Sequence, residues 1–119
     1  MGHGIASELG FLSAATARSV AETMQALAAP SRVRILSRLG VGACSVNDLA
    51  RDVGMEQSAV SRQLRMLRHL GLVTGQRSGR TVTYALFDEH VAMLLDEAVY
   101  HAEHLHLDIR DRPESTAVS

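Results

Sequence analysis

Cysteine is almost absent from this chain of 119 residues, in which Cys44 is the only one. A single thiol cannot build a thiolate metal cluster within the chain, and the apolar neighbours of Cys44 favour a packed thiol over a reactive one. The chain also lacks a charged amino-terminal segment followed by a long apolar run, so we expect neither a signal peptide nor a membrane span. These absences predict a cytoplasmic protein in a reducing compartment, with no membrane partner.

Lysine is absent as well, so all twelve cationic side chains are arginines. The base composition of the genome explains this bias as well as guanidinium chemistry does. The bias by itself therefore does not indicate a function. The net charge of −1 hides an uneven distribution: residues 30–80 hold nine arginines against three acids, and residues 88–119 hold eight acids against two arginines. The middle of the chain is therefore the candidate nucleic-acid surface, and its acidic end favours cations.

Glycine and proline are missing from residues 88–106, which hold four of the six histidines. The apolar residues of this stretch keep helical spacing, so we predict one long helix. At about 100° per residue, His101 lies roughly 20° from His90 around the helix axis, and His104 lies roughly 40° away on the other side. These three histidines are predicted to form one narrow face.

One copy of this helix cannot close a metal site. His90 and His101 lie about 16 Å apart along the axis, whereas imidazole nitrogens bind a first-row metal at about 2.1 Å. An antiparallel partner helix, with the two-fold axis near Asp96 and Glu97, would bring its His101 and His104 beside His90. We therefore predict a homodimer with two intersubunit metal sites.

Asp88 precedes His90 by two residues and would point to nearly the opposite side of a continuous helix. We expect it just outside the helix, at the N-cap, where its carboxylate could face the metal, the backbone amides or both. An aspartate in this place is more often a cap than a ligand. A second interpretation stays open, in which the histidines respond to pH or to another non-metal signal.

Five helices and one hairpin are predicted, within a single domain over residues 13–107. Residues 1–12 are glycine-rich and should form a flexible arm, and residues 108–119 are too polar to fold and should form a disordered tail. Helical spacing begins at residue 13, and Pro30 suits the start of a second helix that ends at Gly40. A third helix is expected between a cap at Ser45 and a terminator at Gly54.

A short turn separates the third helix from a fourth over residues 58–70, whose Val60, Leu64 and Leu67 share one face. Its outer surface is polar and basic, which is typical of the second helix of a helix-turn-helix. That helix enters the major groove by its amino end, so its early residues meet base edges and its later arginines meet phosphates. The predicted base-edge residues are Gln57, Ser58, Ser61 and Arg62, Gln63 is included in the interface, and the predicted phosphate contacts are Arg65 and Arg68.

Residues 72–87 alternate β-forming side chains around Ser78 and Gly79, which predicts a hairpin with Gln76, Arg77 and Arg80 at its tip. A hairpin beside a recognition helix is a wing, and its arginines would reach the minor groove or the backbone of double-stranded DNA. The alternative is a basic helix that is only a solvated face. The order of helix, turn, basic helix and hairpin favours DNA binding.

The span from about residue 24 to residue 106 resembles the ArsR/SmtB family of winged-helix, metal-responsive repressors. The resemblance rests on LAAPSRVRIL, on DLARDVGMEQSAVSRQLRMLRHLGLV, on the hairpin and on the histidine helix. One metal site of that family is a Cys-x-Cys pair on the third helix, where this chain has Ser45 and Asn47. The resemblance therefore implies no thiolate site of that kind, and Cys44 lies beside the pattern rather than on it.

The other family site is Asp-x-His followed, ten residues later, by His-x-x-Glu or His-x-x-His. This chain carries the second form, which together with the opening MGHG looks like the nickel and cobalt sensors of the family. The resemblance thus implies Ni(II) or Co(II) as the effector, with Zn(II) as the alternative. An amino-terminal histidine could also be a chance feature of a disordered start. The implied ligands are Asp88, His90, His101 and His104, joined by Gly2 and His3, with His106 as a weaker candidate.

The sequence therefore predicts a homodimeric winged helix-turn-helix repressor, mainly helical with one small hairpin. The form without metal should bind double-stranded operator DNA, and metal should shift the population toward a dimer whose recognition helices no longer match successive major grooves, roughly 34 Å apart. An enzyme is not expected, because no general base or open coordination position is visible. No small organic substrate is expected either.

Overall fold

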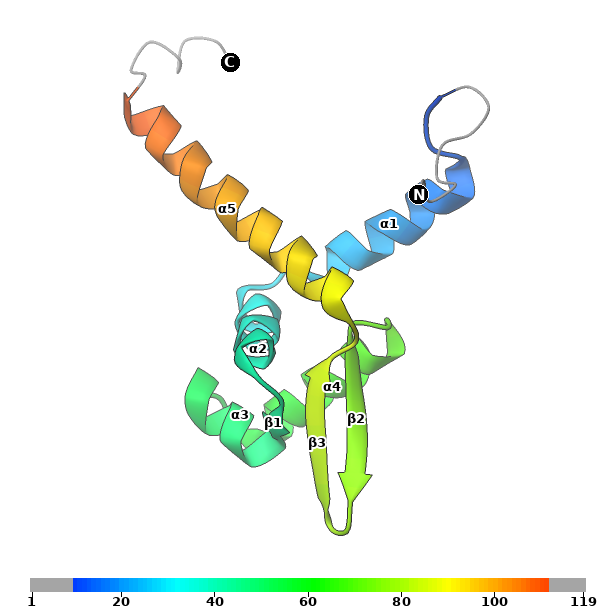
Figure 1. Ribbon diagram of the computed structural model, residues 1–119, viewed down its shortest axis with the longest axis vertical. Helices are drawn as coiled ribbons and strands as arrows, with labels where there is room; N and C mark the ends of the chain where they lie inside the picture. Colours follow the sequence, from blue (N-terminus) through cyan, green and yellow to red (C-terminus); the bar gives the residue numbers. More distant parts are fainter. Residues whose placement is uncertain (1–9, 112–119) are drawn as a thin grey trace.

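Five helices and three short strands follow one another in the computed structural model, which describes the backbone of residues 10–111 and the side chains of residues 10–105. A central body is formed by the elements from α2 to β3, and α1 and α5 project away from it (Figure 1). The elements are α1 (Ala14–Ala26), α2 (Pro30–Val41), β1 (Cys44–Ser45), α3 (Val46–Val53), α4 (Gln57–His69), β2 (Val73–Ser78), β3 (Thr81–Leu86) and α5 (Glu89–Asp111).

Short polar residues and glycine mark several helix ends as predicted, although α2 continues one residue past the predicted end at Gly40, to Val41. The hydroxyls of Ser13 and Ser45 accept hydrogen bonds from the amides of Thr16 and Asp48, which satisfies free N–H groups in the first turns of α1 and α3. Gly54 takes the left-handed conformation, at φ 70°, that closes α3. At the carboxyl end, α5 continues to Asp111, four residues beyond the expected domain limit at 107.

The wing is part of a three-stranded antiparallel sheet in the order β1-β3-β2. The pairing of Ser78 with Thr81 leaves Gly79 and Arg80 as the turn, one residue later than predicted, and Gly79 has the positive φ of 65° that a type II′ turn requires at its first central position. The strand β1 was not predicted, because two residues are too few to show periodicity. Its pairing with β3 anchors the base of the wing to the start of α3.

The core lies inside the body, where α2, α3 and α4 meet and the wing covers one side. Its largest fully buried side chains are Ile35, Leu36, Leu49, Val60, Leu64 and Leu67, and the last three form the face predicted for the fourth helix. In the part of α5 whose side chains are described, residues 89–105, the first turns join this core through Val91 and Leu95. Because these residues bury almost all of their surface, they supply most of the hydrophobic stabilisation within one chain.

The outer helices are barely packed within one chain. In α1, Ala26 is the only buried residue, and the apolar side chains of Val20 and Met24 are 40% and 50% exposed. Residues 96–105 of α5 are all exposed, including Leu105. Burial of the apolar residues on the histidine face therefore needs a partner outside the chain. Among the described residues, no helix has the length and apolar character needed to cross a membrane.

Candidate nucleic-acid interface and metal-ligating residues

The helix-turn-helix is built by α3 and α4, joined through Gly54 and the two residues after it. Met55 donates its amide to the Ala50 carbonyl at 3.0 Å, which keeps the turn tight. The buried side of α4 packs into the core, so its opposite side faces solvent. The exposed or half-exposed residues of that side are Gln57, Ser58, Ser61, Arg62, Arg65 and Arg68.

Gln63 does not share this surface. Its side chain is half-buried, and its amide nitrogen donates a hydrogen bond of 3.4 Å to the Ser31 hydroxyl of α2. Gln63 sits about 100° further around α4 than Arg62, which turns it toward the body. The membership of Gln63 in the interface therefore stays a prediction, and in the structure its side chain contacts α2.

A polar hollow of about 530 Å³ lies between α4 and the wing. The guanidinium of Arg68 lies against Gly75 of β2, where an added Cβ would meet the Arg68 Nη1 at 3.2 Å and a ring carbon of Tyr84 at 3.1 Å. Glycine at residue 75 thus permits the close approach of α4 to the wing. Ser61, Arg65, Arg68, His69 and Tyr84 line the hollow, and Tyr84 was absent from the predicted interface.

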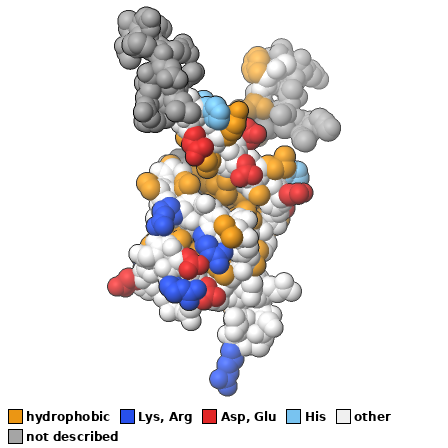
Figure 2. Space-filling view, turned by 60° about the vertical axis from the view of Figure 1, so that its left-hand side comes forward, with side chains coloured by type: hydrophobic (Ala, Val, Ile, Leu, Met, Phe, Trp, Pro, Cys, Tyr) orange, Lys and Arg blue, Asp and Glu red, His pale blue; other side chains and the backbone are white. Residues whose placement is uncertain are grey.

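The nine arginines of the basic segment fall into two groups. Arg32, Arg34, Arg38 and Arg51 are bonded internally, for example from Arg34 to the Val53 carbonyl at 2.7 Å. The other five form no ion pair or side-chain hydrogen bond within residues 10–105, and all five are exposed. Figure 2 shows arginines over the body and at the hairpin tip, and histidine, acidic and hydrophobic side chains at the end where α1 and α5 project. The free group is Arg62, Arg65, Arg68, Arg77 and Arg80.

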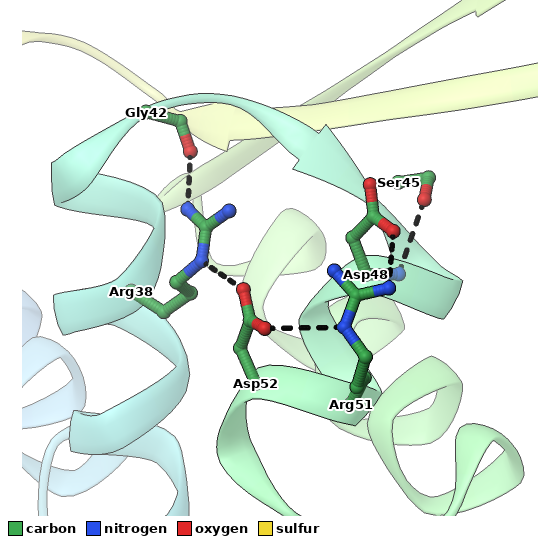
Figure 3. Close-up of polar contacts among 6 residues, drawn as sticks. All are labelled: Arg38, Gly42, Ser45, Asp48, Arg51 and Asp52. Atoms are coloured by element: carbon green, nitrogen blue, oxygen red, sulfur yellow. Dashed lines mark hydrogen bonds and ion pairs between the residues drawn. The ribbon is translucent and has the colours of Figure 1, made fainter.

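Arg38 joins α2 to α3 (Figure 3). Its Nε donates to the Asp52 carboxylate at 2.7 Å and its Nη1 to the Gly42 carbonyl at 2.9 Å. Arg51 also contacts Asp52, at 3.4 Å, and Asp48, at 3.1 Å. The hydrogen bond from Arg38 lowers the pKa of the Asp52 carboxyl and raises that of Arg38, while burial raises the pKa of the Cys44 thiol nearby. These ion pairs join α2 to α3 and engage both arginines within the chain.

Asp88 lies just before α5, as expected, and its two carboxylate oxygens contact different groups. One carboxylate oxygen accepts the Val91 amide at 3.2 Å, as an N-cap does, and the other lies 3.5 Å from the His90 Nδ1. Both side chains reach solvent. Capping therefore does not remove Asp88 from the neighbourhood of His90, and the two residues form a ready pair of oxygen and nitrogen donors.

His101 and His104 lie on the exposed distal part of α5. The His104 Nδ1 is 2.9 Å from the Tyr100 carbonyl oxygen, and its ring stacks on that of Tyr100. Among the described residues, no three His, Cys, Asp or Glu side chains of one chain come close enough to hold a metal ion. Within one chain, Asp88 thus lies beside His90, and both are separated from His101 and His104.

Three of the predicted metal ligands fall outside the part of the chain whose side chains the structure describes. Gly2 and His3 lie outside the described residues, and so does the side chain of His106. Tyr100, in contrast, was not among the predicted site residues. Its position four residues before His104 was the available signal, because residues four apart meet on a helix surface.

Comparison with known proteins places this geometry in a family. The model of the arsR family of bacterial regulatory proteins matches residues 29–74. The chain is 56% identical over 118 residues to the HTH-type transcriptional regulator NmtR of Mycobacterium tuberculosis, covering 97% of this chain and 98% of that protein. The chain belongs to the ArsR/SmtB family. The predicted metal-responsive transcriptional repressor is thereby confirmed as its functional class, and an enzyme is excluded.

Two solved structures support the winged helix-turn-helix fold of this ArsR/SmtB chain. The solution structure of apo-NmtR is 57% identical, with a TM-score of 0.71, and the match covers 90% of this chain and 88% of that one. A homodimeric winged helix-turn-helix DNA-binding domain from Mycobacterium bovis is 33% identical, with a TM-score of 0.71 and coverage of 76% and 83%. In the present chain, Ser45, at one Cys-x-Cys position of the family, caps α3.

Proposed function

We propose that this protein is a homodimeric repressor that binds operator DNA without metal and releases it when Ni(II) or Co(II) binds at two intersubunit sites. The observation that carries the proposal is the division of donors along α5. Asp88 and His90 are paired at its start, and His101 and His104 are exposed on its distal part. Two antiparallel copies of α5 would unite the two halves twice, once for each symmetric site.

Dimerisation through α1 and α5 is supported by their exposed apolar side chains. Val20, Met24, Val99 and Leu105 are between 40% and 50% exposed in the single chain. Exposed apolar residues gathered on two helices favour a protein interface. The relative from Mycobacterium bovis is described as homodimeric, which supports the same assembly for this chain.

The choice of metal follows from the number of donors. Asp88, His90, His101 and His104 would satisfy four-coordinate Zn(II), and the same nitrogen and oxygen donors suit Ni(II) and Co(II). Two further donors, the amine of Gly2 after removal of Met1 and the imidazole of His3, would complete a six-coordinate site. We therefore propose Ni(II) or Co(II) as the effector and keep Zn(II) as the alternative.

The DNA contacts that we propose lie on α4 and the wing. Gln57, Ser58, Ser61 and Arg62 lie at the amino end of α4, which enters the major groove in a helix-turn-helix and reads base edges there. The free arginines further along, Arg65, Arg68, Arg77 and Arg80, supply positive charge to the phosphates on either side.

Metal acts by shifting a population between two dimer arrangements. Ligation across the interface fixes the angle between the two copies of α5, and through Val91 and Leu95 each helix is joined to the body that carries α4. To move DNA occupancy from nearly complete to nearly absent, the metal must favour the released arrangement by about 5 kcal/mol. Several ligand bonds spanning one interface supply energy of that order.

A complementation experiment tests the intersubunit site. One variant carries Asp88→Asn and His90→Ala, and the other carries His101→Ala and His104→Ala, so neither homodimer holds a complete site. Subunit exchange between equal amounts should restore about a quarter of the wild-type Ni(II) capacity, because half of the dimers are mixed and each mixed dimer regains one of two sites. Recovery of no capacity in verified mixed dimers contradicts an intersubunit site.

Asp88→Asn by itself separates the two roles of Asp88. Asparagine caps a helix about as well as aspartate, so the thermal unfolding midpoint should stay within a degree or two of wild type, while Ni(II) affinity falls. Asp88→Ala is the matched variant and should lower both. Unchanged Ni(II) affinity in Asp88→Asn would show that Asp88 is a cap alone.

The absorption spectrum of the Co(II) form tests the metal preference. A six-coordinate Co(II) ion absorbs weakly in the visible range and a tetrahedral ion absorbs strongly, so the full chain should give weak bands that intensify in His3→Ala. Intense bands in the full chain that do not change in His3→Ala favour the four-donor Zn(II) alternative and exclude the amino-terminal residues as ligands.

A further inference from the structure

Tyr100 forms the closest contact around the histidine side chains that the structure describes in α5, which are His90, His101 and His104. The ring centroids of Tyr100 and His104 are 3.8 Å apart, and the two ring planes differ by 29°, which is a stacked arrangement. The Tyr100 carbonyl lies 2.9 Å from the His104 Nδ1. One residue thus contacts both the face and one edge of the imidazole.

The carbonyl contact determines which nitrogen of His104 is free. A carbonyl oxygen only accepts hydrogen bonds, so the Nδ1 that faces it must carry the proton. In a neutral imidazole the lone pair then belongs to Nε2, on the far side of the ring from this bond. Histidines that bind metals commonly donate their second N–H to a backbone carbonyl or a carboxylate, which fixes the ring and the tautomer.

The stacking contact determines how the ring is turned. A surface histidine on a helix samples several rotamers, and only some of them keep Nδ1 near the carbonyl four residues earlier. A stacked aromatic ring favours the one orientation in which both contacts form. Within residues 10–105, His101 has neither a stacked ring nor a hydrogen-bond partner of this kind, so the two distal histidines differ in how far they are oriented before any metal arrives.

We propose that Tyr100 is a positioning residue for His104: its ring stacks on the imidazole and its carbonyl accepts the Nδ1 proton, which leaves Nε2 as the atom that binds the metal. The inference rests on the proposed metal site, because it assigns the atom through which one of its ligands acts. It adds a residue that touches no metal and acts through His104.

The test compares two variants of the full-length dimer. Tyr100→Phe keeps the aromatic face, and Tyr100→Leu keeps apolar bulk but removes that face. Long-range proton–nitrogen NMR spectra of the metal-free protein at pH 8.5, where free imidazole is neutral, report the tautomer of each histidine, with His104 assigned from a His104→Gln sample. Calorimetric titration with Ni(II) gives the affinity, and sedimentation verifies that each variant is dimeric.

The expected results differ between the two variants. Wild type and Tyr100→Phe should hold His104 with its proton on Nδ1 and bind Ni(II) equally well. In Tyr100→Leu, the ratio of this tautomer to the other should fall, and the dissociation constant for Ni(II) should rise, each by about 3- to 10-fold, the range expected for loss of one aromatic stack. The tautomer of His101 should not change in either variant.

Two results overturn the inference while leaving the proposed function intact. The first is a Tyr100→Leu dimer with wild-type His104 tautomer and Ni(II) affinity, provided that His104→Gln abolishes binding at the same site. The second is an equal change at His101 and His104, which would show a general disturbance of α5. If His104→Gln itself leaves Ni(II) affinity unchanged, the proposed metal site fails, and the inference fails with it.

Discussion

The body and the outer helices of this protein differ in how much of their apolar surface one chain covers. In the body, Leu36, Leu49 and Leu64 are fully buried, whereas Met24 of α1 and Leu105 of α5 are about half exposed. A body with a closed core can present its DNA-binding surface in a single chain. In the proposed function, each chain contributes half of a metal site and half of an interface through its outer helices, so sensing would need two chains. On this proposal, the residues that bind DNA belong to the body of one chain, whereas the control of DNA binding by metal depends on the dimer.

The largest effect is expected from the core of the body. Leu64→Ala removes a fully buried side chain of α4 and should lower the free energy of unfolding by about 2 to 5 kcal/mol. Met66→Ala, two residues away and 37% exposed, is the matched control and should cost much less. Chemical denaturation followed by circular dichroism measures both. Similar losses in the two variants would show that the body is not the stability centre of the chain.

A different outcome is expected on α1, where the pair Val20→Ser and Met24→Ser should leave the body folded and weaken the dimer. Losing the burial of two apolar side chains should cost about 2 kcal/mol, or roughly 30-fold in the dimer dissociation constant. Ala15→Ser, on nearly the opposite side of α1, serves as the control. Sedimentation equilibrium measures the constant, and an unchanged value in the double variant would remove α1 from the interface.

Within the body, we expect the free arginines to have two roles, because some contact base edges and others contact phosphates. Arg62→Ala should weaken operator binding by about 1 to 3 kcal/mol and reduce the preference for operator over random DNA. Arg77→Ala should weaken binding to every sequence and reduce the salt dependence by about one unit. Fluorescence anisotropy at several salt concentrations tests both. The same salt slope and the same specificity in the two variants would contradict this division of roles.

The smallest effect is expected from loss of the ion pair between Arg38 and Asp52. The hydrogen bond from Arg38 lowers the pKa of the Asp52 carboxyl, so the ionised form stabilises the fold above the ordinary aspartate range, and this contribution is lost as pH falls through the lowered pKa. Asp52→Asn should therefore unfold at a lower temperature than wild type at pH 6, and the gap should close toward pH 3. A gap that widens on acidification would contradict the sign of the shift.

The body was largely predictable because its signals are local. Ser45, Pro30 and Gly54 mark helix ends by the chemistry of single residues, and Val60, Leu64 and Leu67 mark a buried face by their spacing. What escaped prediction depends on contacts between distant segments. The strand β1 is defined by its pairing with β3, and the inward turn of Gln63 is defined by Ser31 of α2.

Charge was the least reliable of the sequence signals. The nine arginines of residues 30–80 look alike in the sequence, yet only five are free in the fold. Arg38 and Arg51 are engaged because α2 and α3 bring Asp52 to them, which spacing along the chain does not reveal. The histidine face, in contrast, follows from one continuous helix, which the structure contains as α5; the intersubunit metal site on it stays a prediction.

The central claim is that metal on α5 controls DNA binding without belonging to the DNA surface. The most direct measurement is fluorescence anisotropy of a labelled upstream DNA fragment, titrated with the protein and then with Ni(II), for wild type and His101→Ala. Wild type should bind, release on adding Ni(II) and rebind after chelation. The His101→Ala variant should bind the DNA with wild-type affinity and stay bound at every Ni(II) concentration that releases wild type. Release of His101→Ala at the same concentrations, or loss of its metal-free DNA binding, would contradict the account.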